Sequence, residues 1–85
     1  MARWRLKAWL VDRPKLEAKR HWQTDCKLCA IAKAQELAQS VAKAQRVHVD
    51  RVKWTAEKLT GGPDAWTILY HSGQRIGPLP RRHGH

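Results

Sequence analysis

The 85-residue sequence predicts an α+β fold in which one mainly antiparallel sheet is covered on one face by a single amphipathic, Ala-rich helix. Two stretches near the N-terminus alternate apolar and polar residues, as half-buried strands do. Residues 26–45 have a helical period instead, and two more alternating stretches follow. The expected order is β-β-α-β-β, with a single compact domain at 1–77 and a basic, mobile tail at 78–85.

The first strand is expected at 3–11. Its apolar face consists of Trp4, Leu6, Ala8 and Leu10. Its other face is basic with one aromatic residue, and consists of Arg3, Arg5, Lys7 and Trp9. The Asp and Pro of 12–15 predict a turn. Residues 16–22 alternate again, but Arg20 interrupts their apolar face, so we expect an edge strand that forms a hairpin with the first.

The helix is expected at 26–45 because its apolar residues fall on one side of a helical wheel and no Gly or Pro interrupts it. That side is mostly alanine and consists of Ala30, Ile31, Ala34, Leu37, Ala38, Val41 and Ala42. Thr24 or Asp25 is expected to cap the N-terminus. Small side chains allow a close approach, so we expect the helix to pack across one face of the sheet.

Residues 46–58 fit either a helix starting at Asp50 or a strand, and their β-branched residues and regular alternation favour the strand. The inward residues would be Val52, Trp54 and Ala56, and the outward residues Arg51, Lys53, Thr55 and Glu57. The next strand is expected at 65–71, with Trp66, Ile68 and Tyr70 on one side. Residues 76–80 contain two prolines, which restrict them to a short edge strand.

The chain is strongly basic, with 17 Lys and Arg against 7 Asp and Glu, and a formal net charge of +10. Such a surplus in a small domain favours an anionic partner, and nucleic acid is the commonest. A solvated basic surface is the alternative explanation. The sequence shows no secretory signal and no apolar stretch of membrane-spanning length, and with only two cysteines it indicates a cytoplasmic protein.

The stretch HWQTDCKLC at 21–29 raises the question of a metal or redox site. A zinc site would use Cys26 and Cys29 with two histidines, for instance His21 and His48, but the second half of a zinc signature is missing. A dithiol redox site would need parallel βαβ units that the pattern does not show. We interpret the stretch chiefly as a helix start and expect no metal and no cofactor.

No acid–base pair or nucleophile triad has an informative spacing, so we do not expect an enzyme. If the basic strand faces meet on an open sheet face, they form a platform for phosphates and unstacked bases. We therefore predict a small, non-enzymatic protein that binds DNA or RNA. The predicted contacts are Arg3, Arg5, Lys7, Trp9, Lys19, Arg51 and Lys53.

The alternative function is a protein-interaction module, such as a phage or mobile-element regulator or inhibitor. It would dock on an acidic surface of a host protein through Trp anchors, with the positive charge steering the encounter. The five tryptophans exceed what one helix–sheet contact is expected to bury. A homodimer that covers Trp9 is therefore also expected.

Overall fold

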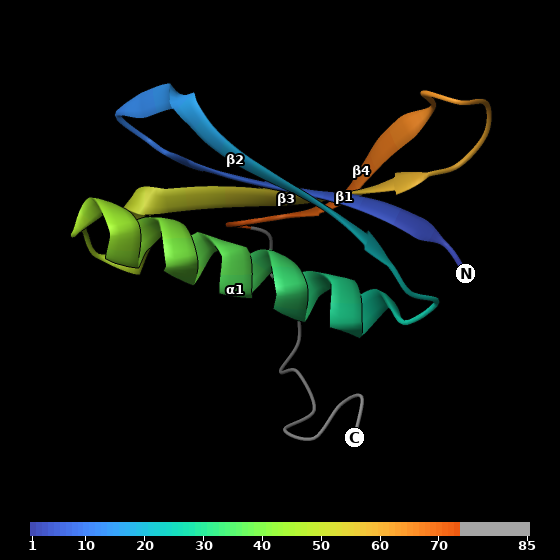
Figure 1. Cartoon of the computed structure of the whole chain (residues 1–85), viewed down its shortest axis with the longest axis horizontal. Coiled ribbons are helices and arrows are strands. Elements are labelled where there is room, and N and C mark those ends of the chain that lie inside the picture. Colours follow the sequence, from blue (N-terminus) through green and yellow to red (C-terminus); the bar gives the residue numbers. More distant parts are fainter. Residues whose placement is uncertain (74–85) are drawn as a thin grey trace.

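The computed structural model describes residues 1–73, and Figure 1 shows their arrangement. The elements are β1 (Arg3–Leu10), β2 (Arg13–Gln23), α1 (Lys27–Gln45), the 3₁₀ turn η1 (Val49–Arg51), β3 (Val52–Leu59) and β4 (Trp66–His71). The strands form one antiparallel sheet in the order β2-β1-β3-β4. The predicted α+β class and element order are confirmed. The expected strand at 76–80, the domain end at 77 and the tail at 78–85 lie outside the described residues.

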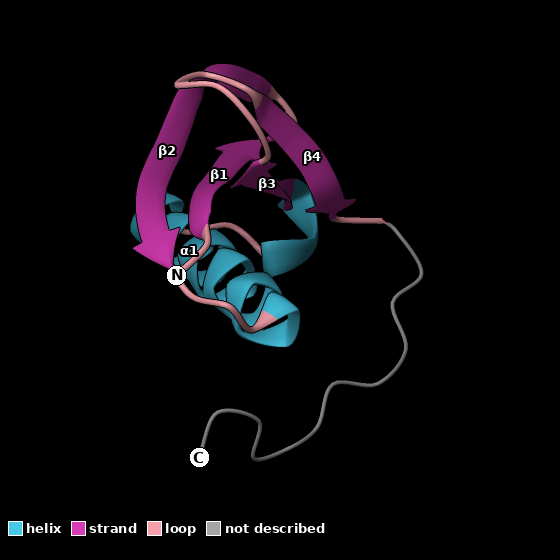
Figure 2. Ribbon diagram, turned by 90° about the vertical axis from the view of Figure 1, so that its right-hand side faces the viewer, coloured by secondary structure: helices cyan, strands magenta, loops and turns pink. Residues whose placement is uncertain are grey.

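The sheet and the helix form two layers. Helix α1 runs along one face of the sheet, and no element of residues 1–73 covers the opposite face (Figures 1 and 2). The β1–β2 and β3–β4 hairpins rise away from the helix at opposite ends of the sheet (Figure 1). Within the described part of the chain, α1 is not long and apolar enough to cross a membrane.

We call the uncovered side of the sheet the open face. Residues that pair across antiparallel strands point to the same side, so the register assigns its members. They are Arg3, Arg5, Lys7 and Trp9 of β1, Lys19, His21 and Gln23 of β2, Lys53, Thr55, Glu57 and Leu59 of β3, and Trp66, Ile68 and His71 of β4.

The core lies between α1 and the two central strands. The apolar face predicted for the first strand is buried, as are Val52, Trp54 and Ala56 of β3, which confirms the strand interpretation of that stretch. The buried helix residues are Ala30, Ile31, Ala34, Leu37, Ala38 and Ala42. Since four of these six are alanine, the helix backbone can approach the sheet closely.

The helix cap differs from the prediction. Cys26 occupies the N-cap with an extended backbone, and its Sγ accepts a hydrogen bond from the N–H of Cys29 at 3.1 Å. Thr24 Oγ1 instead accepts from the N–H of Cys26, and Asp25 Oδ1 accepts from the N–H of Ala2 at 2.8 Å. The expected caps were wrong, because both side chains hold the β2–α1 connection in place rather than the first helical turn.

The first turn is shorter than predicted. Val11 and Asp12 form it, and β2 already begins at Arg13, so the turn predicted at 12–15 was wrong. Pro14 therefore lies inside a strand. It is tolerated there because β2 is an edge strand, as expected, and a residue without an N–H need not break the ladder at an edge.

Strand β4 carries a bulge at Leu69, where its pairing with β3 shifts by one residue. The extra residue turns Tyr70 to the helix side, where its ring stacks on Trp4 with 6.4 Å between the centroids. Trp66 and Ile68 remain on the open face. The prediction that Trp66, Ile68 and Tyr70 share one side was wrong, because a bulge breaks the two-residue alternation.

The cysteine cap gives a stability prediction. A hydroxyl oxygen accepts a hydrogen bond more strongly than sulfur, so Cys26→Ser should stabilise the fold by up to about 1 kcal/mol. For a domain of this size that corresponds to a rise of up to roughly 4–8 °C in the melting temperature, measurable by circular dichroism. Cys26→Ala is the control and should melt below the wild type. A serine variant that melts below the alanine variant would show that position 26 is not the cap.

Candidate nucleic-acid interface

The open face brings together six of the seven predicted contact residues. They are Arg3, Arg5, Lys7, Trp9, Lys19 and Lys53. Lys7 of the central strand β1 lies directly opposite Lys19 of β2, and Trp9 lies opposite Lys53 of β3. Like charges directly opposite each other in a sheet are destabilising. The face thus holds a lysine pair of like charges, of which Lys7 has a carboxylate nearby and Lys19 has none among residues 1–73.

One buried carboxylate balances part of this charge. Glu57 of β3 is only 6% exposed, although it lies on the open face. It accepts a hydrogen bond from Arg5 Nε, and its other oxygen lies 3.7 Å from Lys7 Nζ. Among residues 1–73, neither Arg3, Lys19 nor Lys53 forms an ion pair. These three side chains therefore carry the unbalanced positive charge of the face.

Arg5 is covered as well as paired. Its guanidinium carbon lies 4.7 Å from the ring centroid of Trp66, which comes from the far edge strand β4. Trp66 also contacts the ring of His21 of β2, with 5.8 Å between the centroids and 57° between the planes. We call Arg5, Glu57, Trp66 and His21 the Arg5 cluster. In a flat sheet β2 and β4 would be roughly 14 Å apart, so their side chains meet only by reaching over Arg5.

The Arg5 cluster changes the predicted role of Arg5. A guanidinium that is hydrogen-bonded to a buried carboxylate and stacked on an indole is a poor first contact for a phosphate. Neither Trp66 nor His21 was among the predicted nucleic-acid contacts, although alternation placed His21 on the same side of the second strand as Lys19 and it was also a zinc candidate. The available signal was the alternation of 65–71, which places Trp66 on a strand face, but the strand order needed to bring it to Arg5 cannot be derived from that pattern.

An open hollow of about 650 Å³ lies next to the Arg5 cluster, at the start of β1. We call it the β1-end hollow; the open-face residues in its wall are Arg3, His21, Gln23 and Trp66. Trp66 is half-buried, whereas the other three side chains are exposed. The hollow therefore combines an aromatic wall with one guanidinium and one amide that solvent can reach.

Arg51 does not belong to the open face. It lies in η1, one residue before β3 begins, and its Nη1 is 2.9 Å from the Oδ2 of Asp12 in the β1–β2 turn. The prediction that Arg51 points outward from the third strand together with Lys53 was wrong, because the strand starts at Val52.

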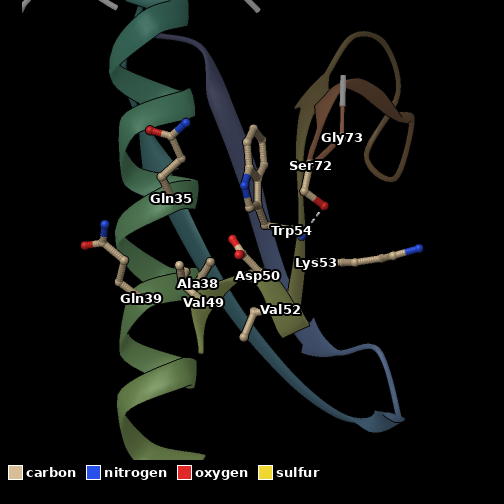
Figure 3. A pocket seen from close by; sticks show the side chains of 10 residues that line it. All are labelled: Gln35, Ala38, Gln39, Val49, Asp50, Val52, Lys53, Trp54, Ser72 and Gly73. Atoms are coloured by element: carbon tan, nitrogen blue, oxygen red, sulfur yellow. Dashed lines mark hydrogen bonds between the residues drawn. The ribbon is translucent and has the colours of Figure 1, made fainter. Parts of the chain in front are cut away.

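A second hollow lies on the other side of the sheet, between α1 and β3 (Figure 3). The indole of Trp54 fills its inner end, and the backbone N–H of Trp54 donates a hydrogen bond to Ser72 Oγ at 3.0 Å. Lys53 points away from the helix, in agreement with its place on the open face (Figure 3). The wall of this hollow includes Gln35 and Asp50, so it lacks the concentrated positive charge of the open face.

The zinc candidates are not brought together. Cys26 and His48 flank opposite ends of a 19-residue helix, which at 1.5 Å per residue places them roughly 28 Å apart. His21 contacts Trp66 instead. Within residues 1–73, no three His, Cys, Asp or Glu side chains are placed to hold a metal ion. The hydrogen bond with Cys26 raises the pKa of the Cys29 thiol, and desolvation adds to the shift, which disfavours the thiolate.

The buried carboxylate gives a second stability prediction. Glu57→Gln removes the charge that Arg5 and Lys7 share, so the free energy of unfolding should fall by about 1–3 kcal/mol in a urea titration. The matched control is Glu17→Gln, because Glu17 is an exposed acid of β2, and its loss should change stability by less than about 0.5 kcal/mol. Equal losses in the two variants would contradict the assignment of Glu57 as the central counter-charge.

Comparison with protein-family models, with curated proteins and with solved structures finds no match for this chain. Within residues 1–73, the open face, with its lysine pair, its Arg5 cluster and its adjacent hollow, is the candidate site.

Proposed function

We propose that this protein binds nucleic acid through the open face and catalyses no reaction. The observation that carries the proposal is the lysine pair of Lys7 and Lys19 on an uncovered sheet face, next to Trp9 and Lys53. An anion between the two ammonium groups would turn their repulsion into attraction. A chain of phosphates supplies such anions at regular spacing, and each neutralised phosphate releases counterions into solution.

A buried hydroxyl next to the lysine pair supports the same ligand. Thr55 lies directly opposite Lys7 on β3, and its Oγ1 has no hydrogen-bond partner among the described residues. Buried polar atoms in folded proteins normally have a partner. A phosphate oxygen drawn toward Lys7 could accept this hydrogen bond once the side chains that cover Oγ1 move aside.

The position of Trp9 fits contact with a base or sugar. Trp4 and Trp54 are part of the core, and Trp22 packs under the ammonium group of Lys33 at 4.6 Å from its ring centroid. Trp9 is half-buried on the open face, opposite Lys53. An aromatic ring beside cations lets a nucleic acid stack while its phosphates are neutralised.

An acidic protein surface is the second candidate partner, and a homodimer remains a further prediction. The cores of protein–protein interfaces are depleted in lysine, whereas interfaces with nucleic acid are strongly positive. Symmetric pairing of two open faces would also bring the lysine pairs of two copies together. Both arguments favour nucleic acid as the ligand of the open face.

Salt dependence tests the proposal directly. If Arg3, Lys7, Lys19 and Lys53 each neutralise one phosphate, the plot of log affinity against log salt for a single strand should have a slope of about −3. Fluorescence anisotropy with labelled 12-mers of DNA and of RNA between roughly 50 and 300 mM salt measures it. No binding of either strand at about 50 mM salt and micromolar protein would refute the proposed function.

A charge reversal separates binding from stability. Lys19→Glu should stabilise the fold by about 0.2–1 kcal/mol, because it places opposite charges across the β1–β2 pair. The same change should weaken binding at least tenfold, since it puts a carboxylate in the phosphate path. The two readouts, urea unfolding and anisotropy, should thus move in opposite directions.

Lys27→Glu is the matched control for this charge reversal. It alters the net charge equally, but Lys27 is an exposed residue at the start of α1, on the other side of the sheet. Its binding should stay within about threefold of the wild type. Equal loss of binding in both variants would show that net charge alone, rather than the open face, attracts the ligand.

A further inference from the structure

We propose that the β1-end hollow binds one unstacked nucleobase, so that the protein selects single strands over duplexes. This inference rests on the proposed function. It adds that the protein recognises an unpaired base, which distinguishes a single strand from a duplex. Phosphates alone are common to single strands and duplexes, and cannot separate them. Selection of single strands therefore requires protein groups that contact bases, in addition to the cations that contact phosphates.

The wall of the hollow contains such groups. Trp66 and His21 present aromatic rings, and the amide of Gln23 offers both a donor and an acceptor for the edge of a base. Arg3 lies opposite Gln23 across the β1–β2 pair, so its guanidinium can contact the phosphate of the same nucleotide. Ring, amide and guanidinium together match a nucleotide better than they match a free phosphate.

The aromatic wall is fixed before a ligand arrives. Arg5 supports Trp66 from one side, and the buried carboxylate of Glu57 holds Arg5. His21 meets Trp66 from the opposite edge strand. A ring held by contacts from two other strands loses little conformational freedom when a base stacks on it, which favours binding.

The hollow lies at the end of a phosphate path and is large enough to admit a base. Its volume of about 650 Å³ lies within the range of small-molecule sites. Lys7 and Lys19 lie between the hollow and Trp9, and Arg5 and Trp9 are about 14 Å apart along β1. In a duplex the bases are paired and stacked, so none can enter the hollow without first being unpaired.

Abasic probes test the inference. The probes are a labelled 12-mer single strand, the same strand annealed to its complement, and a 12-mer sugar–phosphate chain of the same sugar without bases. We expect the single strand to bind roughly 5- to 100-fold more tightly than the abasic chain, as expected for one or two stacked bases. The duplex should also bind more weakly than the single strand at equal salt.

Variants of the β1-end hollow test whether the preference for the single strand depends on its residues. In Trp66→Ala, the preference for the single strand over the abasic chain should shrink to less than about threefold, while the abasic chain binds within twofold of its wild-type affinity. The abasic measurement also reports that the open face has folded. Gln23→Ala should reduce the preference by a smaller factor, and Gln39→Ala, an exposed glutamine of α1, should leave it unchanged.

The outcomes separate the two proposals. If no probe binds at about 50 mM salt, the proposed function is wrong. If the abasic chain or the duplex binds as tightly as the single strand, or if Trp66→Ala keeps the full preference, the base-binding inference is overturned while electrostatic binding to nucleic acid stands.

Discussion

A single helix can cover only part of a four-stranded sheet, and the rest of this structure follows from that constraint. Four strands span about 14 Å between the outer two axes, whereas a helix with its side chains is roughly 10 Å wide. Helix α1 therefore packs mainly on β1 and β3, the two central strands. The outer strands contact the helix much less, and the open face must be stabilised by contacts within the sheet itself.

The Arg5 cluster supplies such contacts at one end of the open face. Its four side chains come one from each strand: Glu57 from β3, Arg5 from β1, Trp66 from β4 and His21 from β2. A buried carboxylate, a cation and two rings thus connect strands that α1 covers unevenly. The lysine pair and Trp9 lie further along β1, beyond this cluster. One end of the face therefore holds the sheet together, whereas Lys19 and Lys53 towards the other end have no ion-pair partner among residues 1–73.

Local sequence patterns predicted most of the fold. They also predicted the basic residues of the open face, but not the Arg5 cluster. Alternation in 3–11 and the alanine stripe of 26–45 depend only on neighbours in the chain, so the faces of β1 and α1 were predicted correctly. The bulge at Leu69 and the cysteine cap were not predicted, because each is one of several local geometries that the same residue types allow.

Interactions between distant segments were the second limit of the sequence analysis. The six basic and aromatic residues on the open face could be grouped from alternation alone. The contact of Arg5 with Trp66 could not, because it depends on strand order and on side chains that reach across the sheet. Arg51 was misplaced for a related reason: its position in η1 and its ion pair with Asp12 of the β1–β2 turn cannot be recognised from periodicity.

The central position of β1 also has a consequence for how the chain folds. Strand β1 pairs with β2 across a two-residue turn, but its other partner is β3, and the Arg5–Glu57 contact joins positions 52 residues apart. The β1–β2 hairpin and α1 can therefore form early, while one edge of β1 stays open until β3 has been synthesised. Closing so large a loop slows folding and leaves an unpaired central strand exposed in the meantime. The exposed basic side chains of that first hairpin keep such nascent chains apart through mutual repulsion.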